Sequence, residues 1–290
     1  MNRKPILIAG LHRSGTTWLA KMLSLPWEVK YISEPFNPNT GLKVFTDWMV
    51  YISEANQAKY LPEIEKLFKF RGKFRFNLPA LKYWATGLVP GQKRVLIKGV
   101  GGAVYSAEWL VKNFDLEMLG IIRHPAAFYA SLKRMNWRFD FNNLLKQDDL
   151  MKDYLSPFKD KMEKKDMSFA EEAGLLWLVV NYVLDIYVTR NSNWILVRHE
   201  DLSANSVDQY QELYRRFGLD FTPQIEKAIR VHSGAGNVSD VSDYKKALIL
   251  KRDSKSIVKN WQKHLSAGEV EIIRNITGQL GEKYYPKEDW

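Results

Sequence analysis

Short apolar runs recur five times along the chain, and polar or helix-forming stretches separate them. The runs cover residues 6–9, 29–33, 94–98, 116–122 and 194–197. Short runs rich in β-branched and aliphatic residues are typical of buried strands. Strands that alternate with helices favour a mainly parallel sheet that helices cover on both faces. The pattern therefore predicts an α/β fold with a five-stranded sheet.

The longest apolar stretch lies within residues 173–188 and contains Asn181 and Asp185. Ser168 and Glu171 precede it with the spacing of a capping box, which predicts the start of a helix. The two polar residues inside the stretch favour a buried helix over a membrane span. No fixed repeat or Pro/Gly-rich linker divides the 290 residues, so we expect one domain over residues 1–290.

The first apolar run leads into residues 10–15, GLHRSG, and then into a stretch with apolar residues at helical spacing. A strand, a glycine-bounded loop and a helix in this order are the context that a phosphate-binding loop requires. Backbone N–H groups and the positive end of the helix would attract an anion there. Thr16 occupies the position of the lysine in nucleoside-triphosphate loops, whereas Arg13 supplies a cation from within the loop, suited to a bidentate grip on phosphate or sulfate. A tight turn without a ligand is the alternative interpretation.

Composition and charge narrow the choice further. The chain has no cysteine, so disulfides, thiol chemistry and Cys-type zinc sites are excluded, and a cytoplasmic location is expected. The apolar run at residues 6–9 is too short for the core of a signal peptide. The net charge is +10 at pH 7, and residues 59–98 carry ten Lys and Arg against two Glu. This surplus favours an anionic ligand or surface, including nucleic acid.

The loop sequence RSGTTWL resembles the phosphosulfate loop of the sulfotransferases that use 3′-phosphoadenosine 5′-phosphosulfate (PAPS). The resemblance implies that the 5′-phosphate and sulfuryl end of PAPS is held by Arg13, Ser14, Gly15, Thr16 and Thr17. It also implies that Trp18 packs on the adenine. Cytosolic members usually carry lysine at the position of Arg13, whereas several carbohydrate- and protein-directed members carry arginine.

A second motif, RHPAAFYASLKR, follows the fourth apolar run. The proline suits the first turn of a helix, and Ser131 then lies two helical turns beyond Arg123, so that both side chains can converge on one anion. The motif resembles the 3′-phosphate site of the same family, with His124 in place of the usual Asp or Asn; Arg134 could assist. The later RHEDL, residues 198–202, resembles a strand end common in the family, and we expect Arg198, Glu200 and Asp201 to form a structural ion-pair network.

The catalytic candidates lie at the ends of the second and third predicted strands. Glu34 is followed by a proline, and this EP pair resembles the position of the base in carbohydrate-type members. Lys98 matches a family lysine that could neutralise charge on the bridging oxygen of the donor. Cytosolic members carry a catalytic histidine two residues after this lysine, where Val100 stands here, so the resemblance assigns the base to Glu34. A solvated acid before a turn and a surface lysine are the alternatives.

Near the C-terminus, the stretch KRDSKSIVKNW contains Arg252 and Lys255, which could close over the nucleotide. The R-K-G string that family members carry there is absent, so a charged helix start is an equal alternative. No metal is expected, because the spacing of His12, His199, His232 and His264 does not match that of metal ligands.

Taken together, the residues and the resemblance predict a P-loop NTPase-like sulfotransferase fold, closer to carbohydrate and bacterial members than to histidine-base members. We expect sulfuryl transfer from PAPS to a hydroxyl or amine of a small molecule, carbohydrate or lipid-linked glycan, with no nucleic-acid partner. Residues 40–90 and 138–165 are expected to line the acceptor site. The segment FKFRGKFRF, residues 68–76, suits an acidic acceptor or an amphipathic surface. Two alternatives stay open: an atypical P-loop kinase, and a non-catalytic basic surface that binds nucleic acid or an acidic polymer.

Overall fold

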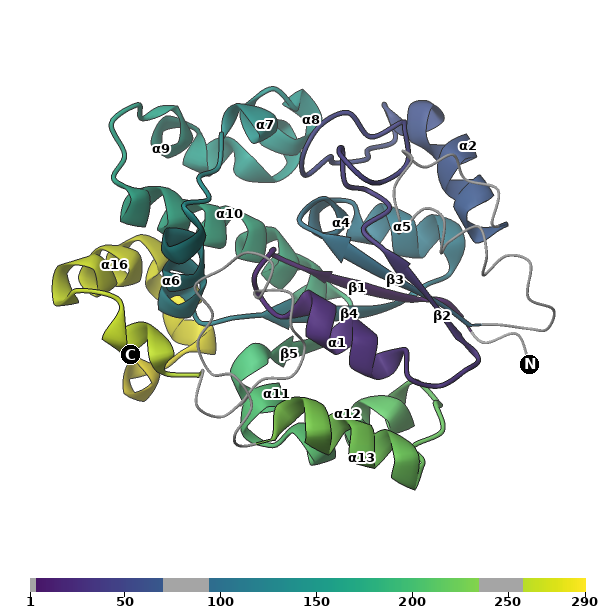
Figure 1. Cartoon of the computed structure of the whole chain (residues 1–290). Coiled ribbons are helices and arrows are strands. Elements are labelled where there is room, and N and C mark those ends of the chain that lie inside the picture. Colours follow the sequence, from purple (N-terminus) through teal and green to yellow (C-terminus); the bar gives the residue numbers. More distant parts are fainter. Residues whose placement is uncertain (1–3, 70–93, 235–257) are drawn as a thin grey trace.

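A computed structural model describes residues 4–69, 94–234 and 258–290 of the chain. Its centre is a sheet of five strands, all parallel, in the order β2-β3-β1-β4-β5 (Figure 1). The strands are β1 (Ile6–Gly10), β2 (Val29–Ser33), β3 (Arg94–Val100), β4 (Glu117–Ile122) and β5 (Ile195–Arg198). The predicted α/β fold is confirmed, and the ends of the strands differ from the prediction by no more than two residues.

The central strand β1 is buried on both faces, which is why its sequence is apolar throughout. Leu7 and Ala9 contribute to one hydrophobic core, whereas Ile6 and Ile8 contribute to the other. Side chains alternate between the two faces of a strand. The apolar run therefore reads as a strand that has a core on each side, as parallel sheets covered by helices require.

Helices cover both faces of the sheet (Figure 1). The core that contains Ile6 is closed by α1 (Thr16–Leu23), α11 (His199–Ala204), α12 (Ser206–Arg216) and α13 (Pro223–Ser233). The core that contains Leu7 is closed by α4 (Gly102–Tyr105), α5 (Ala107–Phe114), α6 (Pro125–Met135), α10 (Phe169–Arg190) and α16 (Ala267–Tyr284).

The helix α10 begins as predicted, with the reciprocal capping box of Ser168 and Glu171. Within the described ranges it is the single helix long and apolar enough to cross a membrane, but 72% of its apolar window is buried inside the protein. It packs along α16 and against α6, which brings the C-terminal part of the chain to the end of β4. The position of α10 in the core explains why its sequence is so apolar.

Short elements fill the expected acceptor segments. Residues 40–69 contain α2 (Gln57–Phe68), while residues 70–93 lie outside the described residues. The later segment contains α7 (Asn142–Leu145), α8 (Asp148–Leu150), the π-helical η1 (Met151–Leu155), the 3₁₀ turn η2 (Ser156–Phe158) and α9 (Lys159–Glu163). Two further 3₁₀ turns, η3 (Asn260–Lys263) and η4 (Lys287–Asp289), flank α16.

Candidate active site

The predicted site residues follow four neighbouring strands at the same edge of the sheet. Strands β2 and β3 lie on one side of β1, and β4 and β5 lie on the other, so the connections diverge at the end of β1. In open α/β sheets this divergence, beyond the carboxyl ends of the strands, is where ligands bind. The structure therefore brings together Glu34 after β2, Lys98 in β3, the 10–15 loop after β1 and Arg123 after β4.

The 10–15 loop has the backbone form of an anion cradle. Arg13 and Gly15 both have positive φ angles, 64° and 91°. A Cβ atom on Gly15 would lie 2.4 Å from His199 Cδ2, so the position requires glycine for space as well as for conformation. The helix α1 begins directly after Gly15 without a side-chain cap, and its first-turn N–H groups are the kind that bind phosphate and sulfate.

Arg13, Ser131 and Arg123 meet beside this loop. Arg13 Nε donates to Ser131 Oγ at 3.0 Å, and an Arg123 guanidinium nitrogen donates to the backbone oxygen of Arg13 at 2.7 Å. Ser131 is buried in α6, two turns beyond the helix start at Pro125, as its spacing from Arg123 predicted. Two guanidinium groups and a hydroxyl at one corner suit a doubly charged phosphate.

Glu34 and Lys98 form an ion pair that reaches the loop. Lys98 Nζ lies 2.6 Å from Glu34 Oε1 and donates to Thr17 Oγ1 at 3.0 Å. The Asn37 amide donates to the other Glu34 oxygen at 2.8 Å. Glu34 has a positive φ of 50°, and its N–H donates to the Lys98 carbonyl, so the turn after β2 is tied to β3. Asn37 was missed from the sequence; its place three residues after Glu34 in a turn was the available signal.

Burial acts to raise the pKa of the Glu34 carboxyl, but the Lys98 ammonium and the Asn37 amide more than offset it, so that the pKa lies below its usual value. Glu34 is thus ionised at neutral pH and accepts hydrogen bonds on both oxygens. While the pair with Lys98 stays intact, Glu34 is a weaker base than a free glutamate. Its strength as a base depends on where the Lys98 ammonium lies.

His12 lies within the loop and near Glu34. Burial, assisted by the adjacent Arg13 guanidinium, lowers the pKa of His12 to about 4. The imidazole is therefore neutral at physiological pH. Its ring meets Phe128 edge-on at 5.6 Å, and the Arg13 guanidinium lies 5.6 Å from the Trp137 ring, so aromatic side chains pack against this part of the loop.

Trp18 lies on the opposite side of the loop. Its ring contacts Tyr210 edge-on at 5.4 Å and lies 6.1 Å from the ring of His199. The expected contact between Trp18 and an adenine stays a prediction. Arg252 and Lys255, predicted to close over the nucleotide, lie outside the described residues.

The expected network of Arg198, Glu200 and Asp201 forms differently from the prediction. Arg198 reaches Asp201 at 3.9 Å and Asp289 at 2.6 Å. Glu200 accepts hydrogen bonds from the His124 N–H and the Tyr285 hydroxyl. The reason is tertiary: α11 turns Glu200 beneath the end of β4, where the C-terminal segment of the chain meets it.

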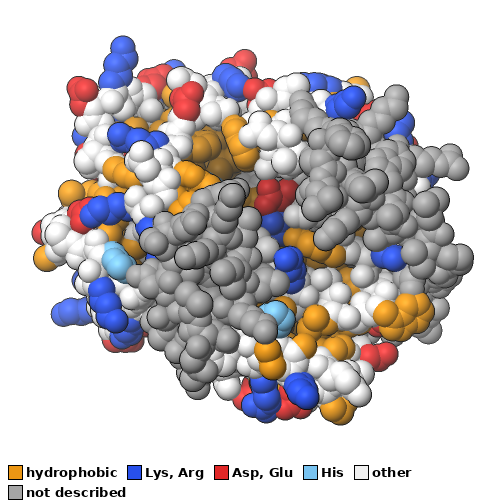
Figure 2. Space-filling view, in the orientation of Figure 1, with side chains coloured by type: hydrophobic (Ala, Val, Ile, Leu, Met, Phe, Trp, Pro, Cys, Tyr) orange, Lys and Arg blue, Asp and Glu red, His pale blue; other side chains and the backbone are white. Residues whose placement is uncertain are grey.

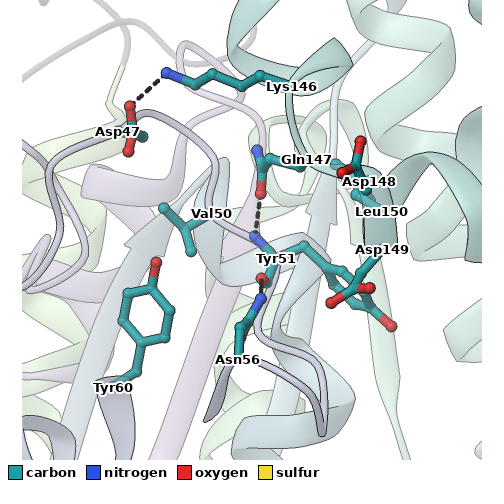
Figure 3. A pocket seen from close by; sticks show the side chains of 10 residues that line it. All are labelled: Asp47, Val50, Tyr51, Asn56, Tyr60, Lys146, Gln147, Asp148, Asp149 and Leu150. Carbon is teal, nitrogen blue, oxygen red and sulfur yellow. Dashed lines mark hydrogen bonds and ion pairs between the residues drawn. The ribbon is translucent and has the colours of Figure 1, made fainter. Parts of the chain in front are cut away.

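A cavity of about 400 Å³ lies between the two segments expected to bind the acceptor (Figure 3). The Tyr60 hydroxyl points into it, and the cavity is otherwise lined by Asp47, Val50, Tyr51, Asn56, Lys146, Gln147, Asp148, Asp149 and Leu150. Gln147 fixes the two segments to each other, because its side chain accepts from the Tyr51 N–H at 2.8 Å and donates to the Met49 carbonyl at 3.1 Å.

The cavity adjoins the residues that directly follow the strand that carries Lys98. Met49 packs over Gly101, where a Cβ atom would lie 2.9 Å from its side chain, and the Val50 carbonyl accepts from the Ser106 hydroxyl at 2.8 Å. Rings continue the contact toward Glu34: Phe36 meets Phe45 at 5.2 Å, and Phe45 stacks on Tyr60 at 5.1 Å. The cavity thus lies on the β2–β3 side of the site.

Among the described residues, no group of three or more His, Asp or Glu side chains gathers in a way that could hold a metal ion. On the face drawn in Figure 2, Lys and Arg side chains are interspersed with Asp and Glu. The fold thus places the cations of the candidate site at the ends of the strands. In the drawn part of this face they do not belong to a continuous basic surface.

Comparisons with known proteins found similar solved structures. The sulfotransferase domain from the curacin biosynthetic pathway has 13% identity over 94% of this chain and 96% of that domain, with a TM-score of 0.50. Mouse sulfotransferase SULT7A1, complexed with PAP, has 13% identity over 97% of this chain and 89% of that chain, with a TM-score of 0.49. Sulfotransferase STF1 from Mycobacterium tuberculosis has 13% identity over 96% and 77% of the two chains, with a TM-score of 0.47. No curated protein matches the chain by sequence.

The likeness to the curacin-pathway domain concerns the fold alone, because the sequence identity is low. The sequence itself carries more: the model of the sulfotransferase family matches residues 5–223, well over half of the chain. That range contains the loop, the ion pair of Glu34 and Lys98, and the corner formed by Arg13, Arg123 and Ser131. The chain belongs to the sulfotransferase family.

Proposed function

We propose that the protein transfers a sulfuryl group from PAPS to a hydroxyl of a small-molecule or carbohydrate acceptor, with Glu34 as the general base. The observation that carries the proposal is the chain of contacts from Glu34 through Lys98 to Thr17. It joins a half-buried carboxylate on the β2 side to the loop after β1 that has the form of an anion cradle. Group transfer needs a base beside the acceptor, a cation beside the charge that develops, and a site that holds the donor, and Glu34, Lys98 and the loop lie in that order.

The chain's own residues suit PAPS as the donor. The loop amides, Arg13 and Thr17 would hold the 5′-phosphosulfate end, and Arg123 with Ser131 would hold the 3′-phosphate. The donors at both places are cations, hydroxyls and N–H groups, which all favour an anion. When bound, PAPS supplies a sulfuryl group that is already attached to a good leaving group. No metal is proposed, because Arg13 and Lys98 provide the positive charge.

Lys98 links the two halves of the mechanism. Its ammonium serves Glu34 and Thr17 in this structure, and it is within reach of the loop. When Lys98 turns toward an anion in the loop, Glu34 loses the charge that lowers its pKa, and burial then strengthens it as a base. Glu34 can take the proton from the acceptor hydroxyl at that stage, while Lys98 and Arg13 stabilise the negative charge that develops on the donor side.

The cavity of residues 47–60 and 146–150 supports a polar acceptor. It offers carboxylates, amides and the Tyr60 hydroxyl from two segments that adjoin the Lys98 strand. Sugar hydroxyls match such a mixture of donors and acceptors better than a purely apolar molecule does. The Glu34–Pro35 pair resembles the corresponding pair of carbohydrate-type members, which also supports a sugar as the acceptor.

We further propose that residues 1–290 form one domain, because α16 packs on α10 and α6 and so joins the C-terminal part to the sheet. A chain without cysteine has no disulfides to lose in a reducing compartment, which supports a cytoplasmic location. The kinase alternative lacks the loop lysine that nucleoside triphosphates require. The alternative of a basic binding surface gives no role to the ion pair of Glu34 and Lys98.

The test is the thermal stability of the protein with 3′,5′-diphosphoadenosine (PAP), with ADP, and with ATP and Mg²⁺. A ligand at 100 times its Kd adds about 2.7 kcal/mol to the free energy of unfolding, or several degrees in Tm for a chain of this size. Stabilisation by PAP alone supports the proposal. A preference for ATP with Mg²⁺ would favour the kinase, and the absence of any shift would favour the binding surface.

A further inference from the structure

The peptide unit between Arg123 and His124 is held on both of its polar sides. Its carbonyl oxygen, which belongs to Arg123, accepts a hydrogen bond from Trp177 Nε1 at 2.7 Å. Its N–H, which belongs to His124, donates to Glu200 Oε1 at 3.0 Å. Because a peptide unit is planar and stiff, two bonds on opposite sides fix its orientation. They therefore also fix the direction in which Arg123 leaves the end of β4.

Glu200 is in turn held by a residue from the far end of the chain. Its second oxygen accepts a hydrogen bond from the Tyr285 hydroxyl at 2.9 Å. Glu200 is 7% exposed and Tyr285 is fully buried, so water does not replace this bond. Burial raises the pKa of the Tyr285 hydroxyl well above its usual value, which keeps it protonated and able to donate. A buried carboxylate that loses one of two donors becomes less well fixed.

Tyr285 itself is fixed from several directions. The Arg198 guanidinium lies 4.6 Å from the centre of its ring, and its backbone oxygen accepts from Trp290 Nε1 at 2.9 Å. The His124 ring meets the Tyr285 ring edge-on at 4.8 Å and stacks on Trp261 at 5.0 Å with an interplanar angle of 9°. The C-terminal segment is thus built around the residue that follows Arg123.

We propose that Tyr285 is a positioning residue for the 3′-phosphate of the nucleotide, acting through Glu200 and the Arg123–His124 peptide unit. The inference rests on the proposed function, since it takes Arg123 as the ligand of that phosphate. Tyr285 lies beyond residues 5–223, the range that the family model matches, so family membership does not assign this role. Tyr285 thus acts on the nucleotide site through Glu200 and not by contact with the nucleotide.

The test compares two nucleotides that differ only in the 3′-phosphate, PAP and 5′-AMP, by calorimetric titration of the full chain. Tyr285→Phe keeps the ring and removes the hydroxyl. We expect its affinity for PAP to fall roughly tenfold, and its affinity for 5′-AMP to change by less than about twofold. Glu200→Gln keeps the side-chain shape but weakens the acceptor, and it should reduce the same ratio. It tests the link from the other side if Tyr285→Phe does not fold.

Tyr284→Phe is the matched control, because it removes the neighbouring hydroxyl, which binds Asp185 and not Glu200. Its ratio of PAP to 5′-AMP affinity should equal that of the wild type. An unchanged ratio in both Tyr285→Phe and Glu200→Gln would overturn the inference, as would an equal loss for both nucleotides, which indicates a structural role alone. If the wild type itself does not prefer PAP over 5′-AMP, the failure belongs to the proposed donor.

Discussion

Two lysine–carboxylate pairs show how differently the two halves of the site are built. At the strand ends, the Lys98 side chain is 4% exposed and contacts Glu34 at 2.6 Å. At the cavity, the Lys146 side chain is 51% exposed and contacts Asp47 at 2.5 Å. Salt and water weaken the Lys146 pair more than the Lys98 pair, because only the Lys98 ammonium is buried; the carboxylates of Glu34 and Asp47 are similarly exposed, at 30% and 37%. The proposed donor half therefore holds its ammonium in place until an anion competes for it, whereas the side chains of the proposed acceptor half can change at small cost in stability.

The largest expected effect is that of Glu34→Gln. We expect turnover to fall by about 10²- to 10⁴-fold, because the amide cannot accept the proton. PAP binding should remain close to that of the wild type, since the amide oxygen can still accept from Lys98. Steady-state rates and PAP titrations measure the two quantities. Glu54→Gln, which alters an exposed pair with Lys112, is the control and should change neither. Equal losses of rate and binding in Glu34→Gln would argue against a base.

Lys98→Met tests two proposed effects of Lys98: stabilisation of charge on the donor and the lowering of the Glu34 pKa. Removal of the ammonium should lower the rate by about 10²- to 10³-fold, because charge on the donor side is no longer stabilised. It should also raise the Glu34 pKa, since burial is then opposed only by the Asn37 amide and more distant charges. The acid limb of the pH–rate profile is expected to move to higher pH. A profile unchanged in position would mean that Glu34 is not the titrating base; Lys112→Met is the matched control.

His124→Asn tests whether the buried His124 beside Arg123 is neutral, through the pH dependence of the free energy of unfolding. Burial lowers the pKa of His124 to about 3, with Arg198 and Arg123 acting in the same direction. Above pH 6.5 both folded and unfolded chains hold the neutral imidazole. Below it, the unfolded chain binds a proton that the folded chain does not, so the free energy of unfolding falls by about 1.4 kcal/mol per pH unit. The variant should lose this part of the slope between pH 6 and 4 in urea unfolding. Identical slopes in the two proteins would contradict a buried neutral His124.

The smallest expected effect belongs to the acceptor half. Tyr60 is 6% exposed, its hydroxyl points into the cavity, and the structure gives that hydroxyl no hydrogen-bond partner among the described residues. Tyr60→Phe keeps the stacking on Phe45. With an acceptor found by screening, we expect KM to rise by about 2- to 10-fold and PAP affinity to stay the same. A loss of PAP affinity would show that the two halves are less independent than the comparison implies.

The fold was predictable because each strand is a short apolar run that turns or polar residues end; β1, β3 and β4 are buried nearly throughout, while β2 and β5 at the sheet edges are half-buried. The same logic located Glu34, Lys98 and Arg123, since polar residues directly after buried runs meet at one edge of a parallel sheet. The converging pair of Arg123 and Ser131 followed from helical spacing. In these cases local sequence determines position, because few alternatives satisfy the pattern.

The remaining contacts depend on distant parts of the chain. Tyr285 reaches Glu200 across 85 residues, and no local pattern encodes that contact. Apart from Tyr60 in α2, the residues that line the cavity lie in loops or in the three-residue helix α8, which are too short to have a period. The predicted network of Arg198 and Glu200 differed for the same reason: the C-terminal segment supplied Asp289 and Tyr285 as partners.

The order of the strands has a consequence for how such an enzyme can change. Neighbouring strands are about 4.8 Å apart, so β2, β3, β1 and β4 space Glu34, Lys98, the 10–15 loop and Arg123 at nearly equal lateral intervals. The register holds this spacing, with Ser33 opposite Lys98 and Gly10 opposite both Val100 and Ile121. A slip of one residue in β3 would turn Lys98 to the other face. New acceptors can therefore arise by replacing loops, whereas the distance over which the sulfuryl group moves is inherited with the sheet.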